Sequence, residues 1–242
     1  MVAEWATWIT SRYAGFGAEG RLRKRRSSFL PSDMPQVRHW NATRPTNGKI
    51  RRRPLHVRYG SEQNAVLTAA HCIFNRRTNR FLLPSSLHVL LGYERGKYAV
   101  HALVGSYTIG PGYDPASELA TASSDWALLQ LLEPLPDNIR PLKFVDRLPS
   151  PGSQLMLASY ALSRLHIMTA DMNCQLVGQV RGSALFEHTC RITQGSSGAP
   201  LVMMKDGSAV IMGLQIAVGR RNGADIMLAV AAPSIMDNLL HR

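Results

Sequence analysis

Short apolar runs separated by turn residues dominate the chain from about Ala65 onward. The runs occupy residues 65–70, 87–91, 98–104, 126–132, 154–162, 175–180, 201–204, 209–217 and 226–231, with Gly, Pro and Asn between them. Runs of this length are typical of β-strands, and no long helical pattern lies between them. The pattern therefore predicts an all-β protein made of barrels or sandwiches, not of βαβ units.

Two further segments organise this β region. Residues 133–152 contain five prolines, and proline is incompatible with central strands, so this segment is expected to connect two halves. Near the end of the chain, Pro233 precedes an amphipathic pattern over residues 235–240, which predicts a short C-terminal helix.

The first sixty residues differ from the rest in both pattern and charge. They show neither strand alternation nor a helical stripe, and they hold 13 Lys and Arg against 3 Asp and Glu. Residues 61–242 hold 15 against 13, so the formal net charge of +12 belongs mainly to the front of the chain. We expect residues 1–62 to form a basic, poorly ordered segment, and we expect no nucleic-acid binding by the main domain.

Two interpretations of residues 1–62 stay open. The segment could be translated in the wrong reading frame and rejoin the frame of the main domain near Ala65, or it could be a genuine basic extension that binds nucleic acid or an anionic membrane. No apolar run approaches the roughly 18 residues of a spanning helix, and no signal peptide is visible in the first thirty residues.

Three short motifs supply a base, an acid and a nucleophile. Residues 67–72 are Leu-Thr-Ala-Ala-His-Cys, residues 125–129 are Asp-Trp-Ala-Leu-Leu, and residues 195–200 are Gly-Ser-Ser-Gly-Ala-Pro. A serine hydroxyl is a weak nucleophile at neutral pH, so acyl transfer needs a histidine to take its proton and a carboxylate to fix the imidazole tautomer. A Gly-x-Ser-Gly turn can also direct two backbone N–H groups at a developing oxyanion.

In these motifs and in their order, the chain resembles trypsin-like serine proteases of the chymotrypsin fold, especially bacterial secreted members related to glutamyl endopeptidases. The resemblance covers residues 63–242. It implies His71 as general base, Asp125 as its orienting acid, Ser197 as nucleophile, and the N–H groups of Gly195 and Ser197 as oxyanion donors.

The resemblance also implies a fold and a function. The fold would be two six-stranded antiparallel β-barrels, residues 63–140 and 141–242, with the active site in the cleft between them. The function would be a serine endopeptidase that cleaves polypeptides through an acyl-enzyme, as a monomer, with no cofactor and no metal. The alternative is a catalytically inactive, protease-like binding protein whose first barrel is incomplete.

Two neighbouring serines compete for the nucleophile role. Counted from the flanking glycines, the family's pattern selects Ser197 over Ser196. Ser196 then occupies the position where zymogen-activated relatives carry an aspartate that pairs with a newly cut N-terminus. Because a serine cannot form that ion pair, we do not expect activation by this route.

The three cysteines bear on the cellular compartment. Relatives carry a cysteine pair just before the active serine, which implies a disulfide between Cys174 and Cys190; the alternative is two buried thiols in a reducing cytosol. Cys72 has no cysteine about fifteen residues earlier, where many relatives place its partner, because His56 stands there. The resemblance and the expected disulfide favour a secreted or periplasmic protein.

Substrate preference rests on two positions that the resemblance selects. Arg191 lies six residues before Ser197, where trypsins carry the aspartate at the base of the specificity pocket, and a guanidinium there would favour an acidic substrate side chain. The alternative is a surface arginine. Gln215 occupies the place where glutamyl endopeptidases carry a pocket histidine, which argues against glutamate specificity.

Overall fold

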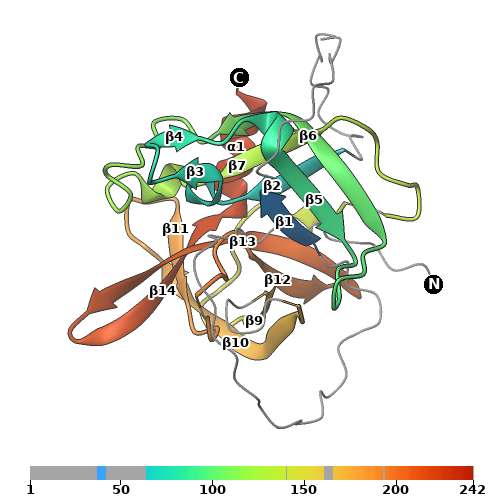
Figure 1. Cartoon of the computed structure of the whole chain (residues 1–242). Coiled ribbons are helices and arrows are strands. Elements are labelled where there is room, and N and C mark those ends of the chain that lie inside the picture. The colour runs from blue at the N-terminus through green and yellow to red at the C-terminus, as the bar shows by residue number, and fades with distance from the viewer. Residues whose placement is uncertain (1–36, 42–63, 140, 161–165, 193, 242) are drawn as a thin grey trace, which may run out of the picture.

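The structure is a computed structural model of the chain, and it describes residues 37–41, 64–139, 141–160, 166–192 and 194–241 (Figure 1). Strands make up most of the regular structure in these ranges, as the short apolar runs predict. Most of the segment expected to be basic and poorly ordered, residues 1–36 and 42–62, lies outside the described residues, so both interpretations of it stay predictions.

Five strands form the first sheet, in the spatial order β1, β5, β6, β7, β2, with every pairing antiparallel. Their bounds are β1 (Val37–Asn41), β2 (Ala65–Thr68), β5 (Leu87–Leu91), β6 (Val100–Ile109) and β7 (Ala127–Leu131). In β6, Ala102 and Val104 are buried while His101 and Leu103 are exposed, the alternation of a strand with one face on a core. Within the described residues the two outer strands, β1 and β2, do not pair with each other.

Strand β1 comes from the N-terminal segment, for which the sequence indicates no strand. It pairs with β5 in the register Val37↔Leu91 to Asn41↔Leu87. Its pattern mixes polar and apolar residues in a stretch too short for periodicity to be detected. The pairing makes residues 37–41 an edge strand of the first sheet.

Six strands form a closed second barrel, in the cyclic order β9, β10, β11, β14, β13, β12, with β12 pairing back to β9. Their bounds are β9 (Gln154–Ser159), β10 (Thr169–Gln179), β11 (Leu185–His188), β12 (Pro200–Lys205), β13 (Ser208–Arg221) and β14 (Ala224–Ala231). A further two-residue strand, β8 (Lys143–Phe144), pairs parallel to β13. The expected all-β, two-barrel fold class is confirmed, and the second barrel has the expected six strands, with β8 as an addition from the proline-rich connector. The first barrel differs from the expectation of six strands, because within the described residues it is an open sheet of five.

The short elements complete the described chain. They are the hairpin of β3 (Phe74–Asn75) and β4 (Arg80–Phe81), the 3₁₀ helices η1 (Ala70–Ile73), η2 (Pro84–Ser86) and η3 (Ala122–Ser124), and the helix α1 (Ala232–Leu240). The helix confirms the expected C-terminal helix; it begins beside Pro233 and buries Ile235 and Leu239.

Apolar side chains pack the two barrels against each other close to the motifs that contain His71 and Asp125. Trp126, which follows Asp125, is fully buried and belongs to one cluster with Leu67 of β2 and with Leu214 and Val230 of the second barrel. Burial of apolar surface contributes about 25 cal/mol per Å², so this cluster holds the segments that carry His71 and Asp125 against β13 and β14.

Candidate active site

His71 lies on the one-turn helix η1, directly after β2. The Cys72 N–H donates to the Ala69 carbonyl at 3.1 Å and so tightens the turn. The apolar side chains of Ala70, Cys72 and Ile73 are buried, whereas the side chain of His71 keeps 22 % of its surface exposed. Because its neighbours on η1 point into the core, the imidazole of His71 points away from it, toward the surface of the first barrel.

Asp125 follows η3 and precedes β7. Its N–H donates to the Ala122 carbonyl at 3.1 Å, which ends the turn, and the buried indole of Trp126 fixes the next position. Gly110 packs closely against this bend, since a Cβ there would lie 2.1 Å from the Ser124 carbonyl oxygen. Asp125 is only 5 % exposed.

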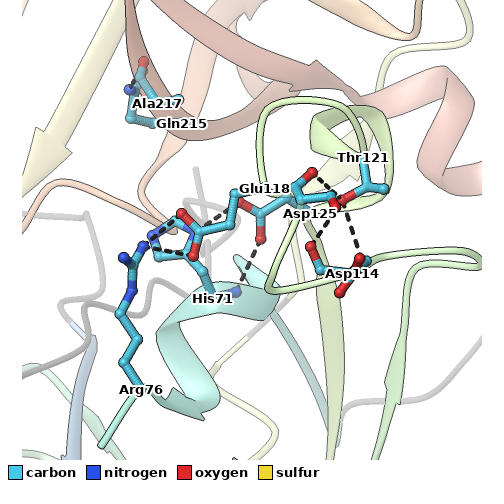
Figure 2. Close-up of polar contacts among 9 residues, drawn as sticks. His71, Arg76, Asp114, Glu118, Thr121, Asp125, Gln215 and Ala217 are labelled. Atoms are coloured by element: carbon cyan, nitrogen blue, oxygen red, sulfur yellow. Dashed lines mark hydrogen bonds and ion pairs between the residues drawn. The ribbon is translucent and has the colours of Figure 1, made fainter. Parts of the chain in front are cut away.

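The structure brings His71 and Asp125 together through two contacts (Figure 2). The backbone N–H of His71 donates to Asp125 Oδ1 at 2.9 Å, and His71 Nδ1 lies 2.6 Å from Asp125 Oδ2. A carboxylate can only accept, so the neutral ring carries its proton on Nδ1 and leaves Nε2 free to accept one.

The surroundings of His71 favour its protonated form. Burial alone lowers the pKa of His71, but Cys72 and Asp125 outweigh burial and raise the pKa well above its ordinary value of 6.5. The nearby negative charge therefore makes the ring a stronger base, which is what a proton acceptor for a serine hydroxyl requires.

The turn that carries the two serines lies at the start of β12. Gly195 and Gly198 have φ angles of 100° and 79°, a region that favours glycine. Ser196 is 2 % exposed, and its hydroxyl lies 2.9 Å from the hydroxyl of Ser159 on β9. Ser197 is half-buried.

A disulfide joins Cys174 of β10 to Cys190, as the resemblance implies. Cys72 is a buried free thiol, and the position of His56, where relatives place its partner, lies outside the described residues. No three His, Cys, Asp or Glu side chains group to hold a metal ion within the described ranges.

The two positions selected for substrate preference have different environments. Arg191 is exposed, and its backbone N–H donates to Asp171 Oδ2 at 2.8 Å. Gln215 is buried; its side-chain oxygen accepts from His188 Nε2 at 2.5 Å, and its amide nitrogen donates to the Ala217 carbonyl at 3.0 Å. Both polar ends of the Gln215 side chain thus have partners within the protein.

A cavity of about 290 Å³ adjoins the His71 and Asp125 pair. Its lining residues are His71, Arg76, Glu118, Leu119, Ala122, Asp125, Ile216, Ala217 and Val218. Arg76, from the β3–β4 hairpin, donates from Nη2 to the two carboxylate oxygens of Glu118, at 2.6 and 2.5 Å (Figure 2). The cavity thus has an ion pair at its wall and apolar side chains from both barrels.

Sequence reasoning missed His188, Arg76 and Glu118. Arg76 and Glu118 are 42 residues apart, and a single histidine at the end of a strand resembles many ordinary half-buried histidines. No motif in the sequence identifies these three residues, because each bonds to a partner that is distant in the sequence.

Comparison with known proteins shows the family to which the chain belongs. A model of the trypsin-like peptidase domain matches residues 57–211, more than half of the chain, and this range contains His71, Asp125 and Ser197. No curated protein matches the chain significantly. The match, the two-barrel fold and the coupling of His71 to Asp125 agree, and the chain belongs to the trypsin-like peptidase domain family.

Proposed function

We propose that the protein is a serine endopeptidase that uses His71, Asp125 and Ser197. The observation that carries the proposal is the double contact of His71 with Asp125, which fixes both the orientation and the tautomer of the ring. Ser197 is favoured over Ser196 as nucleophile because Ser196 is buried against Ser159, whereas Ser197 is half-buried.

In the proposed reaction, Ser197 Oγ attacks the scissile carbonyl carbon while His71 Nε2 takes the hydroxyl proton. The oxyanion accepts hydrogen bonds from the N–H groups of Gly195 and Ser197. The C–N bond then breaks, and His71 gives its proton to the leaving amine. Water repeats the sequence on the acyl-enzyme, with His71 again as base, and releases the carboxylic acid and the free serine.

The free edge of β13 supports a polypeptide as substrate. The β12–β13 ladder ends at Pro200↔Leu214, and the nucleophile turn bonds to Gln215. Beyond Gln215, β13 pairs only with β14 among the described strands. An extended peptide can add to such an edge by main-chain hydrogen bonds and place side chains in the cavity beside His71.

A relation to glutamyl endopeptidases would need a cationic pocket. Arg191 is exposed and does not line the cavity beside His71, which agrees with the alternative of a surface arginine. The Gln215 side chain, already bonded to His188 and Ala217, argues against a direct contact with a substrate carboxylate. Neither position therefore supports a preference for an acidic substrate side chain.

The disulfide supports a secreted or periplasmic location, because such bonds persist in oxidising compartments. Helices in the described ranges fall short of the length and hydrophobicity that crossing a membrane requires. Mass spectrometry without reduction, on protein from its native compartment, should find Cys174 linked to Cys190. Free thiols at both positions would contradict the export proposal.

Labelling with a fluorophosphonate tests the catalytic proposal. The wild-type protein should be labelled at one residue, Ser197→Ala should not react, and the exposed control Ser208→Ala should react like wild type. Labelling that persists in Ser197→Ala would refute the nucleophile assignment. A folded wild type that does not react would instead support the inactive, protease-like binding protein.

A further inference from the structure

A buried histidine, His188, ends β11 and bonds to Gln215 of β13. It is 3 % exposed, and both of its ring nitrogens have hydrogen-bond partners. The Cys190 N–H donates to His188 Nδ1 at 3.2 Å, so the neutral ring must carry its proton on Nε2. That Nε2–H donates to Gln215 Oε1 at 2.5 Å.

Gln215 continues this chain of hydrogen bonds to the cavity. Because its Oε1 accepts from His188, its Nε2 is the end that donates, and it does so to the Ala217 carbonyl at 3.0 Å. Ala217 lines the cavity beside His71. The hydrogen bonds therefore run in one direction, from the backbone beside the disulfide to the free edge of β13.

The backbone of Gln215 holds the nucleophile turn at the same time. The Gly198 N–H donates to the Gln215 carbonyl at 2.8 Å, and the Gln215 N–H donates to the Ala199 carbonyl at 2.8 Å. One residue thus contacts the turn that carries Ser197 through its main chain and the substrate-facing edge through its side chain.

The environment keeps His188 neutral, as this chain requires. Burial lowers the pKa of His188 to about 4, against smaller raising effects of Gln215 and of Asp171 on β10. A proton on Nδ1 would face the donating N–H of Cys190, so the protonated ring would break the first hydrogen bond of the chain.

We infer that His188 and Gln215 are positioning residues that hold the free edge of β13, at Ala217, in register with the turn that carries Ser197. The inference rests on the proposed peptidase function and deepens it. Neither side chain needs to touch the reacting atoms. Their effect is to fix where the main chain of a bound peptide lies relative to the nucleophile. Their loss should therefore raise KM for extended substrates.

Two substrates separate positioning from general structural damage. A tetrapeptide amide reaches along β13 to Ala217, whereas an ester of a single amino acid does not. We expect His188→Met to raise KM for the tetrapeptide about tenfold, the size typical when a buried hydrogen-bonding partner is left unpaired. KM and kcat for the ester should change by less than about twofold, because the backbone contacts of the turn remain.

A conservative variant and a matched control complete the test. His188→Gln offers a side-chain N–H near the place of Nε2 and should restore tetrapeptide KM to within about threefold of wild type. His88→Met removes a half-buried histidine of the first sheet, which pairs with His101, and should leave both substrates unaffected. Rates are expressed per active site by fluorophosphonate titration, so partial misfolding of a variant does not enter. If His188→Met yields no folded protein, the tetrapeptide KM of His188→Gln is compared with that of Gln215→Met, which removes the acceptor of the same hydrogen bond.

The outcomes separate this inference from the proposed function. If the wild type reacts with fluorophosphonate, two results for His188→Met overturn the positioning role alone. One is an equal loss of activity on the tetrapeptide and the ester, and the other is no change on either substrate. A wild type that neither reacts with fluorophosphonate nor hydrolyses either substrate overturns the peptidase proposal and the inference with it. A selective rise in tetrapeptide KM that His188→Gln reverses supports the inference.

Discussion

Replacement of Asp125 by Asn tests whether Asp125 acts by fixing the tautomer of His71. Asparagine has nearly the same shape, and its oxygen can still accept from the His71 N–H at the place of Oδ1. Its amide nitrogen then takes the place of Oδ2, 2.6 Å from Nδ1 in the wild type. A donor there requires Nδ1 to accept, so the ring proton moves to Nε2, which can no longer take the serine proton.

Two magnitudes distinguish this mechanism from the simple loss of a contact. Loss of one hydrogen bond to a charged group costs about 1.5–3 kcal/mol, or about 10- to 150-fold in rate. A wrong tautomer in a Ser-His-Asp triad lowers the rate by about four orders of magnitude, which equals about 5.5 kcal/mol. We therefore expect kcat/KM of Asp125→Asn to fall by about 10⁴.

The assay is hydrolysis of a fluorogenic peptide, with thermal unfolding to show that the variant keeps its fold. Asp137→Asn makes the same change of charge at an exposed position and serves as the control. A kcat/KM of Asp125→Asn within tenfold of wild type would show that another group orients His71. A loss near one hundredfold would show that the contact matters but that the tautomer does not.

Three further results are expected. Activity should rise with pH as His71 loses its proton, with a midpoint above 6.5 because Cys72 and Asp125 raise its pKa; a midpoint at or below 6.5 in the pH profile of kcat/KM would contradict that electrostatic account. Replacing both Cys174 and Cys190 by Ser should lower the free energy of unfolding by about 3 kcal/mol in denaturant titrations, since the bond closes a loop with a sequence separation of 16; an unchanged midpoint would refute this. Gly110→Ala should destabilise the protein by about 1–3 kcal/mol and reduce activity, because the new methyl group meets the carbonyl before Asp125; thermal unfolding like that of wild type would count against it.

Local pattern accounts for much of the fold and for the residues of the candidate site. The apolar runs at 87–91 and 126–132 correspond to β5 and β7, and the amphipathic pattern after Pro233 corresponds to α1. The short strand β1 was not foreseen, since its place depends on pairing with β5 and not on its own periodicity. Strand β8 was missed for the same reason, because its parallel partner β13 lies more than sixty residues further along the chain.

The sequence by itself determined which residue types are available for acyl transfer, since the motifs around His71, Asp125 and Ser197 are local and each adjoins a strand-like run. Only the tertiary structure decided how these residues are supported. The His71 and Asp125 contact spans 54 residues, and the His188 and Gln215 contact spans 27. Hydrogen bonds of this kind depend on how two strands of a barrel are brought together, and strand pairing over such distances is set by the packing of the whole core, which no local pattern records.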